Sequence, residues 1–149
     1  MDDDRSDDLP EVRLLLFGDS WVNAGLYQLR TWPELLGEQL SWLTMNAGTP
    51  GSSSGMLQSQ LQAAVARGVR FHPNAWALIH TGGNDLLQAV NGNLRSFVTS
   101  VVLGTACCGN SSNRNSCGLL DEVVDNIEEL VCNLHSGINV NNIMLVGLP

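Results

Sequence analysis

The sequence predicts a three-layer α/β domain built on a parallel sheet. Short apolar runs alternate along the chain with longer segments whose apolar residues recur at helical spacing. A loop of small polar residues follows each of the first three apolar runs. The length of 149 residues and the hydrophobic fraction of 44% suit one domain with one core. Strands joined by helices in this order give right-handed crossovers, and the working groups of such sheets lie beyond the carboxyl ends of the strands.

The first half of the chain begins with a buried strand over residues 13–17, which read RLLLF. Thr31 and Glu34 have the spacing of a capping box, so a helix is expected from there to about residue 42. A second short strand is expected over residues 43–47. The first helix then has to cross over the sheet between two neighbouring strands.

The second half repeats this alternation. Leu57, Leu61, Ala64 and Val65 predict a helix over residues 56–67, and AWALIH predicts a third strand over residues 75–80. Two further helices are expected, one around residues 94–102 and a long amphipathic one over residues 120–134. A fourth strand begins at NIMLVGLP, the last eight letters of the sequence.

Charge and composition exclude several function classes. The net charge of −8 is unsuited to nucleic acid, whose phosphates require a basic surface. All seven basic residues are arginines, so a lysine-containing phosphate loop and a Schiff-base lysine are both excluded. No run reaches the roughly 18 apolar residues of a membrane span.

The acidic residues 1–10 are expected to form a disordered tail, ahead of one domain over residues 11–149. The tail lacks an apolar signal-peptide core, so the default localisation is cytoplasmic. The secretory pathway stays open if the N-terminus is incomplete.

Three of the four cysteines, Cys107, Cys108 and Cys117, lie close together in one polar stretch. Their spacing does not match a zinc site, so no metal is expected. They are either free thiols of a surface loop or the ends of a loop-closing disulfide from Cys117 to Cys107 or Cys108. A glycosylation sequon at Asn110 weakly favours an oxidising compartment.

The loops after the first three strands together contain what acyl transfer needs. Ser20, in the first loop, can act as a nucleophile at the end of a strand. Its own N–H, a glycine N–H of the Gly48–Gly55 loop and the side-chain amide of Asn84 can stabilise the oxyanion. Each such donor contributes about 3–4 kcal/mol to transition-state stabilisation.

These three blocks, in this order and each after a predicted strand, resemble those of the SGNH (GDSL) hydrolase family. The blocks are Gly18-Asp19-Ser20, NAGTPG from Asn46 to Gly51, and Gly82-Gly83-Asn84-Asp85. The resemblance implies a flavodoxin-like three-layer fold and ester hydrolysis through an acyl-enzyme, with no metal or cofactor. It assigns the nucleophile to Ser20 and the oxyanion hole to Gly51 and Asn84. The implied substrates are small-molecule esters such as lipids, thioesters or acetylated sugars.

One part of the family pattern is missing. No Asp-x-x-His occurs, and none of the histidines His72, His80 and His135 has an aspartate three residues before it. The sequence stops at a strand, so we expect a domain incomplete at its C-terminus, with little turnover and one apolar face of the sheet uncovered. His80, at the end of the third strand, is the candidate for a substitute base, although packing alone can explain it.

A non-catalytic binding module on the same fold is the alternative function. In that case the Gly48–Gly55 loop would cradle a phosphate or a sugar hydroxyl. Asp85 is expected to act as a helix cap or a supporting group rather than as a base. The sequence does not determine the substrate or the oligomeric state.

Overall fold

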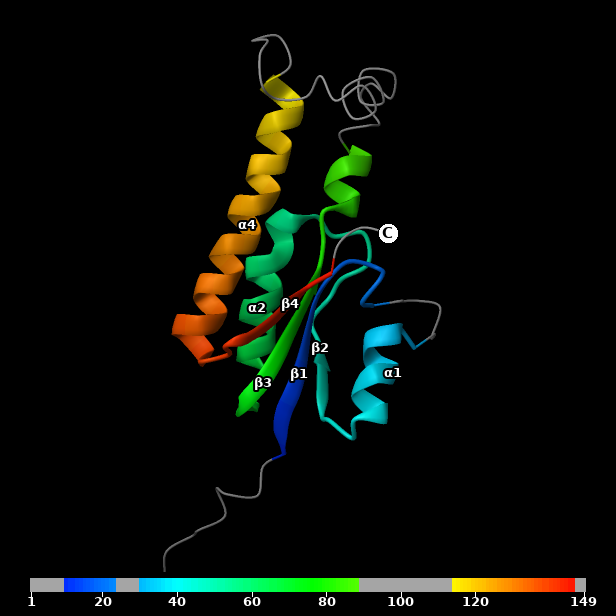
Figure 1. Cartoon of the computed structure of the whole chain (residues 1–149), viewed down its shortest axis with the longest axis vertical. Coiled ribbons are helices and arrows are strands. Elements are labelled where there is room, and N and C mark those ends of the chain that lie inside the picture. The colour runs from blue at the N-terminus through cyan, green and yellow to red at the C-terminus, as the bar shows by residue number, and fades with distance from the viewer. Residues whose placement is uncertain (1–9, 24–29, 89–113, 147–149) are drawn as a thin grey trace, which may run out of the picture.

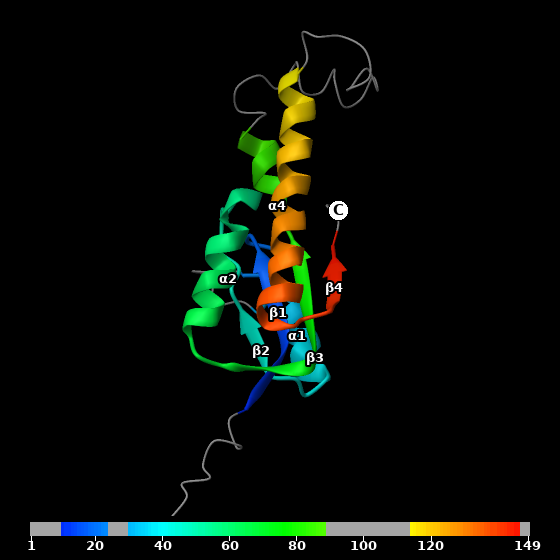
Figure 2. The same cartoon turned by 90° about the vertical axis from the view of Figure 1, so that its left-hand side faces the viewer.

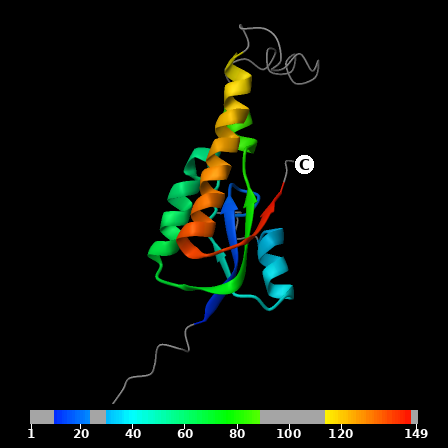
Figure 3. The same cartoon turned by 60° about the vertical axis from the view of Figure 1, so that its left-hand side comes forward.

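The structure, a computed structural model, describes residues 10–23, 30–88 and 114–146 (Figure 1). Its four strands form one sheet in the order β2-β1-β3-β4, and every neighbouring pair is parallel. The arrowheads of β1, β3 and β4 point the same way in Figure 3. The strands are β1 (Glu11–Gly18), β2 (Thr44–Asn46), β3 (Arg70–His80) and β4 (Asn142–Leu145).

Helices cover both faces of this sheet, which confirms the predicted three-layer α/β fold. The helices are α1 (Trp32–Gln39), the 3-10 turn η2 (Ser54–Met56), α2 (Leu57–Ala66) and α4 (Arg114–Ile138). Figures 1 and 2 show α2 and α4 on one face and α1 on the other. The strand order is that of the flavodoxin-like class, in which the order reverses between β1 and β3.

The central strand β1 is apolar on both faces because both are covered. Leu15 and Phe17 belong to the larger core cluster with α2 and α4, whereas Leu14 and Leu16 belong to a smaller cluster on the α1 face. All four are 3% exposed or less. A parallel strand buried in this way reads as a continuous apolar run, which is the signal that predicted it.

Two elements are longer than their sequence patterns predict. Strand β3 starts at Arg70 instead of residue 75, and its register against β1 shifts between Val12 and Leu14. The irregularity removes Pro73 from the ladder, so its missing N–H costs no sheet hydrogen bond. Helix α4 also extends beyond the predicted residues 120–134 in both directions.

Several predictions lie outside the described residues. They concern the tail over residues 1–9, the helix around residues 94–102 and any disulfide from Cys117 to Cys107 or Cys108. Cys132, which is described, is an exposed free thiol. Among the described helices, none is both long enough and apolar enough to cross a membrane.

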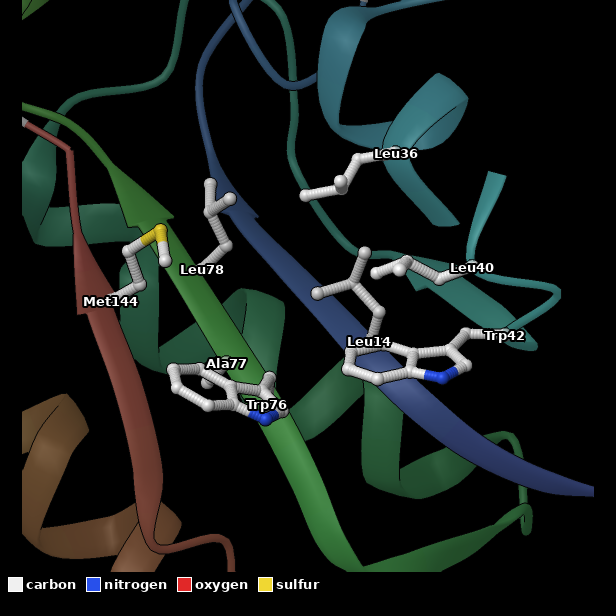
Figure 4. A pocket seen from close by; sticks show the side chains of 8 residues that line it. All are labelled: Leu14, Leu36, Leu40, Trp42, Trp76, Ala77, Leu78 and Met144. Atoms are coloured by element: carbon white, nitrogen blue, oxygen red, sulfur yellow. The ribbon is translucent and has the colours of Figure 1, made fainter. Parts of the chain in front are cut away.

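An apolar groove of about 200 Å³ lies beside α1 on the smaller-core face of the sheet. Figure 4 shows side chains from β1, α1, β3 and β4 around it. On its β3 and β4 side, Trp76 and Met144 are 36% and 43% exposed. These two side chains are therefore partly uncovered. The lining residues are Leu14, Leu36, Leu40, Trp42, Trp76, Ala77, Leu78 and Met144.

Candidate active site

The first candidate loop begins at a position that requires glycine. Gly18 ends β1 with φ +135°, and a Cβ added there would lie 1.8 Å from the backbone oxygen of His80 on β3. A side chain is therefore excluded both by the dihedral angle and by the neighbouring strand. The Asp19 carboxylate then accepts the Trp21 N–H at 3.0 Å, which closes a tight turn. Ser20 lies inside this turn and is exposed.

The backbone of Gly18 is held by three donors from the second loop and α2. Its carbonyl oxygen accepts the Thr49 N–H, the Ser52 hydroxyl and the Gln60 side-chain amide, each at 2.8 Å. Its N–H donates to the Gln60 side-chain oxygen at 2.9 Å. The Gln60 amide thus pairs with both the N–H and the carbonyl of Gly18, as a neighbouring peptide group would. These bonds attach the turn that contains Ser20 to the core.

Asn46 connects the second loop to the first loop and to α1. Its amide donates to the Val22 carbonyl at 2.6 Å and to the Glu34 carboxylate at 2.8 Å, while its oxygen accepts the Gly48 N–H at 3.0 Å. Burial raises the pKa of Glu34, but hydrogen bonds from the Thr31 N–H, the Asn46 amide and the Thr31 hydroxyl, together with the charge of Arg30, outweigh it. The net effect lowers the pKa of Glu34.

Gly51 lies further along the second loop, in an open position. Its φ is +77°, a value that favours glycine, and a Cβ added there would meet nothing within 4 Å. The residue is exposed. The next residue, Ser52, is buried and donates its hydroxyl to Gly18, as described above. Gly51 therefore stands at the surface, directly beside a residue that is bonded to the first loop.

The third block, predicted as a loop, is helical from Gly83 onward, and two of its side chains join it to the second loop. The Asn84 amide donates to the Ser52 carbonyl at 2.8 Å, and an amide of this kind has a second N–H for another acceptor. The buried Asp85 carboxylate accepts the Ser54 N–H at 2.9 Å and the Ser54 hydroxyl at 2.7 Å. Ser54 is the first residue of η2. Asp85, expected to act as a helix cap or a supporting group, therefore supports the start of that turn from another segment of the chain.

A buried histidine and a buried aspartate face each other across β1 and β3. His80 and Asp19 are 3% and 2% exposed, and His80 Nδ1 lies 3.6 Å from an Asp19 oxygen. His80 Nδ1 has no hydrogen-bond partner. The Trp21 ring lies over the imidazole, with 5.8 Å between centroids. The pair is located where the strand order reverses, the usual position of a site in this fold class.

The structure places the three histidines, which the sequence offered as possible bases, in three different surroundings. His72 bonds to Arg13 near the start of β3, and His135 bonds to Asn141 after α4. His80 alone among the three ends a strand at the edge that carries Gly18 and Ser20. Among the described residues, no cluster of three histidine, cysteine or acidic side chains could hold a metal ion.

Gln60 is the site residue that the sequence reasoning missed. It is 3% exposed and lies on α2 between Leu57 and Leu61, on the apolar stripe that predicted this helix. A buried amide needs hydrogen-bond partners. A single glutamine on an apolar stripe therefore indicates a buried amide with hydrogen-bond partners. It does not indicate which backbone groups those partners are.

No protein-family model matches the sequence, and no curated protein matches it. The structure is similar to solved esterases. A variant of Axe2, an acetyl xylan esterase from Geobacillus stearothermophilus, is 17% identical over 92% of this chain, with a TM-score of 0.49. AlinE4, an SGNH-hydrolase family esterase, is 18% identical over 91% of this chain and 77% of its own, with a TM-score of 0.42. This chain spans 60% of the length of the Axe2 variant.

Proposed function

We propose that this chain is an SGNH-type serine hydrolase domain that cleaves carboxylic esters through an acyl-enzyme on Ser20. The supporting observation is the hydrogen bonding that joins the three loops. Ser52 donates its hydroxyl to Gly18 and accepts the Asn84 amide on its carbonyl. The three segments that contain Ser20, Gly51 and Asn84 are therefore bonded to one another at the carboxyl edge of the sheet.

The chemistry proposed for this edge is attack of the Ser20 hydroxyl on an ester carbonyl. The oxyanion would be stabilised by the N–H groups of Ser20 and Gly51 and by the Asn84 amide. The exposed, open position of Gly51 suits an N–H that approaches a substrate. One bond from the Asn84 amide to Ser52 orients that amide and leaves its second N–H for the oxyanion.

The substrate class proposed is a small-molecule ester, such as a lipid, a thioester or an acetylated sugar. The apolar groove is not the proposed substrate site. The strand residues that line it, such as Leu14 and Met144, lie before the carboxyl ends of their strands, on the α1 face of the sheet. Ester binding is instead expected around Ser20, where Trp21 is 51% exposed. An indole in that position offers an apolar surface to an acyl group.

A phosphate-binding module is less well supported by the same loops. Two backbone N–H groups that could donate to a bound anion already donate within the protein. The Gly48 N–H donates to Asn46, and the Ser54 N–H donates to Asp85. The Asp85 carboxylate also places a negative charge at the start of η2. An added phosphate would meet that charge at close range.

The proposed function is tested with a fluorophosphonate probe, which labels activated serines. The wild-type chain and its Ser20→Ala and Ser59→Ala variants are incubated with the probe, and labelled peptides are mapped. Ser59 is an exposed serine on α2 and provides the matched control. We expect labelling at Ser20 in the wild type and in Ser59→Ala, and none in Ser20→Ala. Equal signals from wild type and Ser20→Ala would refute the hydrolase proposal.

A further inference from the structure

We infer that His80 is the proton acceptor for Ser20 and that Asp19 orients its imidazole. This inference rests on the proposed function, since it supplies the base that the Ser20 nucleophile requires. The proposed base is a histidine of the third strand, and both groups assigned here, His80 and Asp19, precede the Gly82–Asp85 block.

The strand register brings the three residues to one place. Gly18 pairs with His80 across β1 and β3, so the residues that directly follow Gly18 lie beside the end of β3. An Asp19 carboxylate oxygen lies 3.6 Å from the imidazole Nδ1, and the Trp21 ring centroid lies 5.8 Å from the imidazole centroid. Ser20 lies between these two residues in the chain, within one tight turn.

The contact with Asp19 selects the tautomer that a base needs. Nδ1 is the buried nitrogen without a hydrogen-bond partner, and the nearest carboxylate oxygen is that of Asp19. A small closing movement converts the 3.6 Å contact into an Nδ1–H to carboxylate hydrogen bond. The proton is then held on Nδ1, and Nε2 carries the lone pair that accepts a proton.

Packing alone does not account for this arrangement. A histidine kept only for its volume has no reason to direct an unsatisfied nitrogen toward a buried carboxylate, since buried polar groups normally have partners. The carboxylate itself is already used by the turn, because it accepts the Trp21 N–H. The Asp19 carboxylate thus has two functions: it closes the turn that contains Ser20, and it orients His80.

The reaction step balances without any further reactant. As the Ser20 oxygen forms a bond to the ester carbonyl carbon, its proton moves to His80 Nε2. When the carbon–oxygen bond to the alcohol breaks, that proton leaves with the alcohol. Water then attacks the acyl-enzyme, gives one proton to Nε2 and releases the acid, and the proton returns to the Ser20 oxygen.

The test is the rate of Ser20 labelling by the fluorophosphonate probe, measured from pH 5 to pH 8. In this reaction the serine oxygen bonds to phosphorus, fluoride leaves, and the serine proton passes to the base. A general base accepts a proton only in its unprotonated form, so a labelling rate that depends on such a base rises with pH. Asp19 is the charged group at ion-pair distance from His80 among the described residues.

Three variants accompany the wild type. His80→Gln should label at least 100-fold more slowly and without the rise, because general base catalysis contributes about that factor or more. Asp19→Asn should slow labelling too, since an amide does not hold the Nδ1 proton as a carboxylate does. His135→Gln, which changes an exposed histidine in the last turn of α4, should match the wild type.

The possible failures are distinguishable. If His80→Gln labels Ser20 at the wild-type rate and with the wild-type pH profile, His80 is not the base, while the esterase proposal stands. If the wild type is not labelled at all, the proposed function fails and the assignment of His80 fails with it. If circular dichroism shows that His80→Gln does not fold, Asp19→Asn decides, and labelling of that variant at the wild-type rate and with the wild-type pH profile overturns the assignment.

Discussion

Replacing Gln60 by leucine should destabilise both the fold and the turn that contains Ser20. The Gln60 amide makes three buried hydrogen bonds: it accepts the Gly18 N–H and donates to the Gly18 carbonyl and to the Ser52 hydroxyl. Leucine fills a similar volume, so little cavity cost is expected. The change in the free energy of unfolding in Gln60→Leu therefore measures the loss of the hydrogen bonds.

The magnitude follows from what each partner retains. The Gly18 N–H would be buried without an acceptor, which costs about 1–3 kcal/mol. The Gly18 carbonyl keeps its bonds from Thr49 and Ser52, so the loss there is about 1 kcal/mol. The sum predicts that Gln60→Leu lowers the free energy of unfolding by about 2–4 kcal/mol.

Urea unfolding followed by circular dichroism measures this difference. Gln62→Leu, an exposed position on the same helix, is the control and should change the free energy of unfolding by about 0.5 kcal/mol or less. Gln60→Leu should also slow Ser20 labelling, whereas Gln62→Leu should not. Equal stabilities for the two variants would refute the reasoning, because the Gly18 peptide would then not depend on Gln60.

Three further predictions follow from the same contacts. Gly18→Ala should lower the free energy of unfolding by more than about 2 kcal/mol in urea titrations, because its Cβ would meet the β3 backbone at 1.8 Å. Asn84→Ala should slow probe labelling of Ser20 by about 10²–10³-fold through loss of an oxyanion donor, and an unchanged rate would exclude that role. Glu34→Gln concerns pH: the lowered pKa of Glu34 gives stability that is present above its unfolded pKa of about 4.3 and lost as pH falls through the folded value. Urea titrations at pH 7 and pH 3 should show a smaller acid-induced loss in Glu34→Gln, and equal losses would contradict the proposed hydrogen bonding.

The fold was predictable because both of its signals are local. A buried parallel strand such as β1 reads as an apolar run, and the Thr31 to Glu34 spacing marks the start of α1, where the Thr31 N–H does bond the Glu34 carboxylate at 2.8 Å. Element ends were less predictable when tertiary contacts decide them. The third strand was predicted from residue 75, yet β3 begins at Arg70, because a register shift against β1 accommodates Pro73.

The candidate site was predictable as a set of loops, and not as a set of contacts. Gly18 and Asn84 stand out because they follow predicted strands, whereas Gly51 was singled out by the family resemblance. The pairing of His80 with Asp19 depends on the register of β1 against β3, which no local pattern specifies. The bonds from Gln60 to Gly18 join residues 42 positions apart, and their identity depends on how α2 lies on the sheet.

The triple hydrogen bonding of the Gly18 carbonyl also bears on how the chain moves. Opening the turn around Ser20 would break bonds to Thr49, Ser52 and Gln60 at once, so this turn cannot fluctuate independently of β1 and α2. The Gly18 amide proton should therefore exchange with solvent deuterium only when the whole domain unfolds. Although it is a loop by secondary structure, the segment that contains Ser20 is expected to open only together with the core to which it is bonded.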